Sequence, residues 1–148
     1  MATVNSDQIT RLDASVPSKK LDKNNHGWIR RMYFSYTTTA LAIADIIQLV
    51  KLPDNARVVG GALINTNLGA TTTLSIGITG AATRYLGATA TSAAANTPFA
   101  NTVALNYGDI ISVTTGSQGA DVYLIATVGG ATLTAAQTVT GYVDLLLP

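Results

Sequence analysis

Polar and apolar residues alternate along much of the chain after residue 28, in short runs separated by turn residues. Between residues 71 and 79, leucine and isoleucine occupy even positions, whereas serine and glycine occupy odd ones. Such alternation is typical of a strand with one buried face, here the even-numbered face. The pattern predicts strands over residues 28–39, 46–52, 57–65, 71–79, 110–114, 122–128 and 138–146. Roughly eight strands at this spacing indicate an all-β sandwich or barrel.

Four places interrupt this pattern. Residues 39–47 contain good helix formers, but the run is too short to decide between helix and strand. Residues 89–101 are mostly small and offer no large side chain before Phe99, which predicts a surface loop. The Gly60-Gly61 pair predicts a bend in its strand or the close approach of another backbone. Pro53-Asp54-Asn55 predicts a turn.

Charge divides the chain into two unequal parts. Residues 1–35 carry six of the nine basic residues against three aspartates, a net charge of 6 − 3 = +3. This part has no sustained apolar periodicity before Trp28, and Pro17 interrupts any helix in it. We therefore expect an extended N-terminal arm over residues 1–35 and a β-sandwich domain over residues 36–148.

Composition supports the strand prediction and limits the classes of function. Alanine and threonine each occur 22 times among 148 residues and glutamate is absent, which favours strands over helices. A chain of this length can form a core without disulfides, and the absence of cysteine excludes cysteine-ligated metals. The formal charge of +1 argues against general nucleic-acid binding. The longest apolar stretch, residues 40–50, is interrupted by Asp45 and is shorter than a membrane span, and no signal peptide is evident.

Candidate catalytic residues are few. His26 is the single histidine, and without a Gly-x-Ser-x-Gly motif we interpret it as an exposed turn residue. Residues 22–27 match a calcium-binding loop only in part, since the twelfth position is Tyr33 rather than an acid. Most aspartates occupy turns, where they bond local backbone, but Asp144 is expected to point outward with Tyr142 or to have a partner. We expect no catalytic residue, metal or cofactor.

Basic and aromatic residues alternate just after residue 28. Arg30 and Arg31 precede Tyr33, Phe34 and Tyr36, a pattern found in nucleic-acid stacking platforms, although the small net charge weakens that interpretation. Docking on an acidic protein surface and simple protection of a strand edge remain equally open. Three consecutive leucines at 145–147 place apolar side chains on both faces of a terminal strand. The expected capsid or protomer contacts are Lys19, Lys20, Trp28, Arg30, Arg31 and Leu146.

A longer pattern resembles small structural proteins of tailed bacteriophages. In residues 44–78, a strand ends in Lys-Leu-Pro and is followed by a turn, by Ala-Arg-Val, and later by Leu-Gly and a strand of threonine, leucine, isoleucine and glycine. Residues 84–88, 128–135 and 141–144 are similar to the same group. These segments cover about two thirds of the chain, and none contains a catalytic motif.

The resemblance implies a jelly-roll-like antiparallel β-sandwich, often trimeric, that decorates or cements a capsid. We therefore expect a non-enzymatic decoration protein, a homotrimer made in the host bacterial cytoplasm and bound to the outside of the major capsid protein on the virion, with no nucleic-acid or membrane partner. A tail or fibre component is one alternative. A carbohydrate- or receptor-binding module of the same fold is another, for which the aromatic candidates are Tyr33, Tyr36, Tyr85, Tyr107, Tyr123 and Tyr142.

Overall fold

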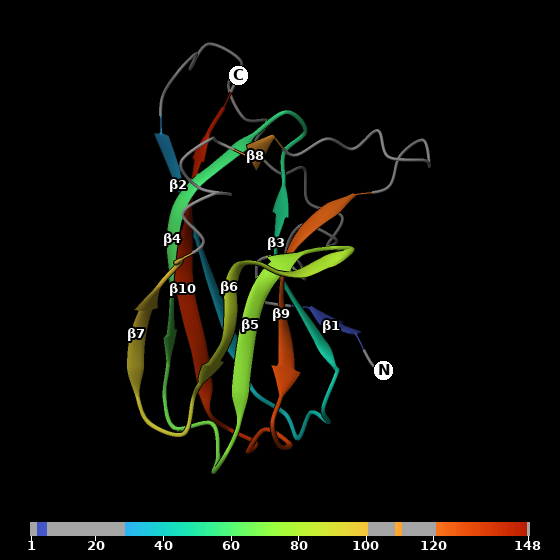
Figure 1. Cartoon of the computed structure of the whole chain (residues 1–148), viewed down its shortest axis with the longest axis vertical. Coiled ribbons are helices and arrows are strands. Elements are labelled where there is room, and N and C mark those ends of the chain that lie inside the picture. Colours follow the sequence, from blue (N-terminus) through green and yellow to red (C-terminus); the bar gives the residue numbers. More distant parts are fainter. Residues whose placement is uncertain (1–2, 6–28, 101–108, 111–120, 148) are drawn as a thin grey trace.

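The computed structural model describes residues 3–5, 29–100, 109–110 and 121–147, which contain strands and no helix (Figure 1). The strands are β1 (Thr3–Asn5), β2 (Ile29–Thr37), β3 (Ile46–Leu52), β4 (Arg57–Asn65), β5 (Thr73–Ile78), β6 (Ala81–Ala90), β7 (Ala95–Pro98), β8 (Asp109–Ile110), β9 (Val122–Gly129) and β10 (Thr138–Leu146). The predicted strands over residues 46–52, 57–65 and 138–146 coincide with β3, β4 and β10.

The strands form two packed sheets. Sheet A has the order β1-β3-β9-β5-β6, and sheet B has the order β2-β10-β4-β7, with β8 also paired to β4. The chain passes from one sheet to the other at most connections, and all neighbouring strands except β1 and β3 are antiparallel. This order of two four-stranded sheets, with β1 and β8 added, is that of a jelly-roll-like sandwich. The predicted fold class is therefore confirmed for the described residues.

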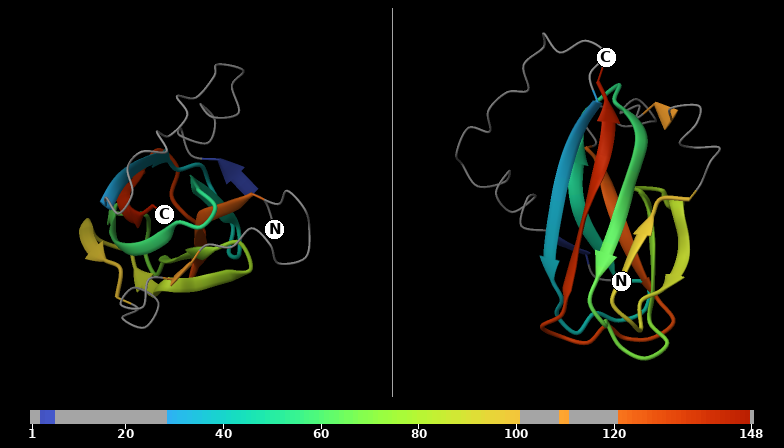
Figure 2. Two further views of the ribbon diagram at one scale, coloured as in Figure 1. Left: turned by 90° about the horizontal axis from the view of Figure 1, so that it is seen from above. Right: turned by 90° about the vertical axis from the view of Figure 1, so that its left-hand side faces the viewer.

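The core lies between the two sheets, as the period-two patterning requires. Sheet B contributes the inward side chains of Phe34, Leu63 and Val143, and sheet A contributes Leu74 and Leu124, all almost completely buried. Removing these apolar side chains from water is the main driving force that holds the sheets face to face. Figure 2 shows β2, β10 and β4 side by side in sheet B.

The outer faces of the two sheets differ in exposure. On sheet A the outward residues Ser75 and Ile125 are buried, and an added Cβ at Gly77 would meet the backbone of Ala81 and Ala82, so the start of β6 lies over this face. The predicted strand over residues 71–79 therefore has both faces buried, and the expectation of one exposed face was wrong. The alternating pattern did not predict this burial, because the serine and glycine at odd positions are small enough for another strand to cover them.

Four loops meet at one end of the sandwich, at the bottom of Figure 1: residues 38–45, 66–72, 91–94 and 130–137, which we call the loop end. Backbone hydrogen bonds join them, from Leu133 N to Leu41 O at 2.9 Å, from Thr134 N to Leu68 O at 2.8 Å, and from Leu68 N to Thr91 O at 2.9 Å. Its one charged residue is Asp45, which is buried and accepts a hydrogen bond from Ala42 N. The loop end is thus an uncharged surface with a shared hydrogen-bond network.

Other sequence-based expectations have mixed outcomes. Residues 95–98 form strand β7 on β4, so the predicted loop over residues 89–101 was wrong there. Residues 39–47 are not helical but contain a turn and the start of β3. Residues 29–35, assigned to the arm from their charge, belong to β2, whereas residues 6–28 lie outside the described residues. Of the predicted strand over residues 110–114, the described part is Ile110 in β8.

The predicted close approach at the glycine pair is confirmed. An added Cβ at Gly61 would collide with the Phe99 ring and would lie 2.6 Å from Tyr142 O. The register between β4 and β10 also shifts between Asp144 and Leu145, opposite this part of β4. Glycine is therefore required where β4 passes under Phe99.

Candidate functional site

The outer face of sheet B is the part of the described structure that gathers the residues singled out by the sequence. Antiparallel register places Tyr142 of β10 between Tyr33 of β2 and Ala62 of β4. Asp144, two residues after Tyr142 in β10, lies between Arg31 of β2 and Gly60 of β4. Because cross-strand partners share a face, these side chains project together away from the core.

A charged and aromatic cluster occupies the middle of this face. Arg31 donates two hydrogen bonds to the Asp144 carboxylate, from Nε to Oδ1 at 2.7 Å and from Nη2 to Oδ2 at 2.9 Å. The Arg31 guanidinium carbon also lies 3.9 Å from the centroid of the Tyr142 ring. Tyr33 meets Tyr142 edge to face, with 6.2 Å between ring centroids. Two parallel hydrogen bonds and ring stacking fix the orientation of the guanidinium.

The hydrogen bond to Asp144 raises the pKa of Arg31 above its ordinary value. Desolvation by burial lowers this pKa, and the Coulomb attraction between Arg31 and Asp144 raises it further. A raised arginine pKa keeps the charged form present until the pH rises through that higher value. The ion pair therefore keeps its cation throughout the neutral and moderately alkaline range.

The same face exposes apolar side chains. Ile29 is 67% exposed, Tyr33 64% and Ile64 37%, and all three project outward from sheet B. Leu146 is half-buried beside Ile29 on the same face. Water therefore contacts a row of isoleucine and tyrosine side chains next to the arginine cluster, an arrangement frequent at protein interfaces.

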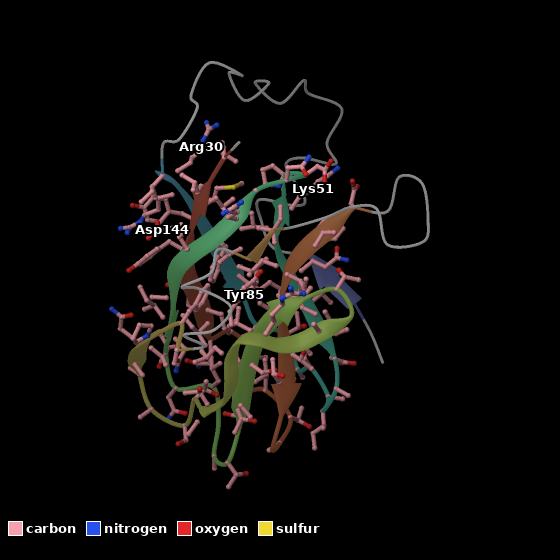
Figure 3. The ribbon with its side chains drawn as sticks, turned by 45° about the horizontal axis from the view of Figure 1, so that its top comes forward. Arg30, Lys51, Tyr85 and Asp144 are labelled. Carbon is pink, nitrogen blue, oxygen red and sulfur yellow. The ribbon has the colours of Figure 1, made fainter. Side chains whose placement is uncertain are left out.

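The structure brings together part of the predicted contact set. Arg31 and Leu146 share the outer face of sheet B. Arg30 is exposed at the same end of β2 (Figure 3), but it pairs with the core residue Leu145 and so belongs to the opposite face of the strand. Lys19, Lys20 and Trp28 lie outside the described residues. Asp144 has both properties expected of it, since it points outward with Tyr142 and pairs with Arg31.

Sequence reasoning missed Ile29 and Ile64 as surface residues of this face. Both are apolar residues in a β-prone run, for which the ordinary expectation is burial. The sequence did indicate an ambiguity at residues 29–34. The odd-numbered positions contain both an arginine and apolar residues, and so do the even-numbered positions. Such a pattern leaves open which set faces the core.

The aromatic candidates for carbohydrate binding are dispersed. Tyr36 and Tyr85 are buried in the core, where Tyr85 stacks on Phe99. Tyr123 belongs to sheet A, and Tyr107 lies outside the described residues. Tyr33 and Tyr142 remain together on sheet B, with an angle of 61° between their rings. These two rings do not form one flat platform of the kind that stacks on sugars.

Other candidate chemistry is limited in the described ranges. No group of three or more histidine, cysteine or acidic side chains there is arranged to hold a metal ion. His26 and the partial calcium-loop match at residues 22–27 lie outside the described residues. The same described ranges contain no helix that is long and apolar enough to cross a bilayer.

These features define a jelly-roll-like β-sandwich with one exposed face bearing arginine, tyrosine and isoleucine. The chain is similar to a chain of the cyanophage Pam1 capsid asymmetric unit, with 25% identity, a TM-score of 0.65, and coverage of 91% of this chain and 96% of that one. It shares its fold with a chain of the capsid of Ralstonia phage GP4, with 19% identity, a TM-score of 0.75 and coverage of 99% of both chains. No protein-family model and no curated protein matches the sequence.

Proposed function

We propose that this chain is a structural protein of a phage capsid, and more narrowly a decoration or cement protein that binds the outside of the major capsid protein shell and stabilises it. The observation that carries the proposal is the extent of the likeness to the Pam1 capsid chain, 91% of this chain and 96% of that one. Correspondence over nearly the whole of both chains supports a common role for the two chains. An isolated shared motif would not support that inference.

The physical requirements of this role fit the chain. A protein that binds the intact shell better than the ruptured one stabilises the shell by mass action, and it needs no catalytic group to do so. Short side chains lose little rotamer entropy when a surface docks, and alanine and threonine make up 22 + 22 = 44 of the 148 residues. A homotrimer, the proposed oligomer, would add effective concentration because three copies bind together.

The proposed contacts are those that the sequence indicated. Arg30, Arg31 and Leu146 lie at one end of sheet B, and the proposed arm of residues 1–35 would add Lys19, Lys20 and Trp28 to the sandwich domain of residues 36–148. Tryptophan and arginine contribute strongly to interfaces when they become buried. In this proposal the protein is made in the host bacterial cytoplasm and ends on the outer surface of the virion.

The proposal is tested with shells of the phage that encodes this chain, prepared with and without it. We expect the purified protein to cosediment with shells that lack it and to raise the temperature at which they rupture. Counting copies per particle separates the roles, because a decoration protein is present in proportion to the many shell subunits. A few copies at one vertex would instead indicate a tail or fibre component, and absence from the particle would contradict the proposal.

A further inference from the structure

Exposed large apolar side chains in the described residues are concentrated on one surface. The described residues include four exposed large apolar side chains. Three of them, Ile29, Tyr33 and Ile64, lie on the outer face of sheet B. The fourth, Ile43, is 58% exposed in the loop end. Among the described residues, the outer face of sheet A carries no large apolar side chain exposed to this degree, and its Ile125 is 4% exposed. An apolar group left in water on one face indicates a surface that a partner covers.

Side chains on this face are already held in place, which lowers the conformational entropy lost when a partner binds. Arg31 is held by two hydrogen bonds to Asp144 and by the Tyr142 ring, so its side chain has little freedom left to lose. Tyr142 in turn is packed edge to face against Tyr33. Arginine and tyrosine in such an arrangement are the residue types that contribute most to interface affinity.

The charge of the face identifies the chemistry of its partner. Arg57 lies on this face beside Leu146, and Arg30 is exposed at the adjoining end of β2. Neither forms an ion pair with a residue whose side chain the structure describes, whereas Arg31 is paired with Asp144. On the described part of this face, Arg31 and Arg57 against Asp144 leave an excess of positive charge at the end of sheet B where Ile29 lies. A partner surface with carboxylates at the matching edge would be attracted and oriented by it.

We propose that the outer face of sheet B docks on a protein surface that combines apolar side chains with an acidic edge, where Ile29, Tyr33 and Ile64 supply the apolar contact and Arg57 the charge. This inference rests on the proposed function, in which the partner is the major capsid protein. It adds the face that binds, two isoleucines and an arginine outside the expected contact set, and the chemistry of the partner surface.

The apolar contribution is tested with two matched isoleucine variants. Ile29→Ser alters the proposed face, and Ile43→Ser alters a similarly exposed isoleucine in the loop end. The probe is a shell of major capsid protein that lacks this chain, and cosedimentation over a range of protein concentrations gives the affinity. We expect Ile29→Ser to weaken binding about tenfold, and Ile43→Ser to bind as the wild type does. Circular dichroism and thermal unfolding establish that each variant is folded.

The charge contribution is tested with a second matched pair that does not depend on the first. Arg57→Gln and Lys51→Gln each remove one positive charge, but Lys51 belongs to β3 of sheet A (Figure 3). Its ammonium pairs with Asp121 at 2.8 Å. We expect Arg57→Gln to weaken shell binding severalfold and to reduce its sensitivity to salt, because one screened attraction is lost. Lys51→Gln should leave both unchanged.

The outcomes separate this inference from the proposed function. If the wild type binds shells and both Ile29→Ser and Arg57→Gln bind equally well, this face is not the docking surface and the proposed function stands. If the wild type binds no shell, both proposals are overturned. Binding of a DNA duplex that Arg57→Gln abolishes, with shell binding unaffected, would also overturn the inference, because the arginines would then serve a nucleic acid.

Discussion

Single glycines set the spacing of sheet B against its core. At Gly141 of β10, an added Cβ would collide with Ala62 O and would lie 2.5 Å from the Phe34 ring. A carbonyl oxygen in a paired strand cannot move without disturbing the ladder of hydrogen bonds, and Phe34 is 2% exposed in a filled core. Glycine is present at this position because there is no room for a side chain.

Gly141→Ala is therefore expected to lower the free energy of unfolding by about 2–3 kcal/mol or more, the cost of overpacking a filled core. Gly87→Ala is the matched control, since an added Cβ there meets nothing within 4 Å. That substitution should be neutral or stabilising by up to about 1 kcal/mol, because alanine restricts the unfolded chain. Urea unfolding of both variants measures the difference, and equal stabilities would show that β10 can shift to accept the methyl group.

Hydrogen bonds made by one threonine connect two strands through the loop end. Thr38 follows β2 and is 2% exposed. Its hydroxyl donates to Thr134 O at 2.6 Å and accepts a hydrogen bond from Gln137 N at 3.0 Å. Both partners precede β10, so Thr38 fixes where β2 ends relative to its neighbour in sheet B.

Thr38→Val keeps the shape of the side chain and removes the hydroxyl. It should lower the free energy of unfolding by about 1–3 kcal/mol, because a buried N–H and a carbonyl lose their partner. Thr132→Val, at an exposed position of the same loop, should change it by less than about 0.5 kcal/mol. Thermal unfolding distinguishes the two, and a loss of stability in the control as large as in Thr38→Val would contradict the assignment.

At the scale of elements, prediction succeeded where side chains alternate and failed where they are small. The strands β3, β4 and β10 were predicted with their observed bounds because bulky β-prone residues fill them. Strand β7, with the sequence Ala-Asn-Thr-Pro, carries no such signal. Its position depends on pairing with β4 and on Phe99, which follows it into the core, and both are tertiary effects.

Phe99 is therefore expected to hold β7 against the sandwich. It is 7% exposed and stacks on Tyr85 with 6.1 Å between ring centroids. Phe99→Ala should cost about 3–5 kcal/mol, the usual loss for a large aromatic core residue, and should speed amide hydrogen exchange in β7 more than in β10. Asn96→Ala, at an exposed position of β7, is the control for the strand itself. Uniform acceleration across sheet B would mean that β7 has no separate anchor.

At the scale of the whole molecule, sequence was sufficient for the fold class but not for the surface. The outward or inward direction of Tyr33 and Phe34 is decided by the register of β2 on β10, which pairs Tyr33 with Tyr142 and Phe34 with Gly141. In the sequence both aromatic residues are adjacent and equally suited to a core. The choice follows from Gly141, whose missing side chain leaves space for the Phe34 ring. A functional face of this kind thus depends on contacts between residues about a hundred positions apart.

The molecule also has two chemically distinct regions: the outer face of sheet B, with its arginines and exposed apolar residues, and the uncharged loop end. If the first contacts the shell, the second can remain in solvent. Because the chain contains no cysteine, single cysteines at Tyr33 and at Thr132 allow a polyethylene glycol chain to be attached to either region. We expect the polymer at Tyr33→Cys to block shell binding, and the polymer at Thr132→Cys to leave the affinity within about twofold, because a bulky group excludes a partner only where the partner docks. The unmodified cysteine variants are the controls for each substitution. Loss of binding with the polymer at Thr132 and retention at Tyr33 would reverse the orientation and place the loop end against the shell.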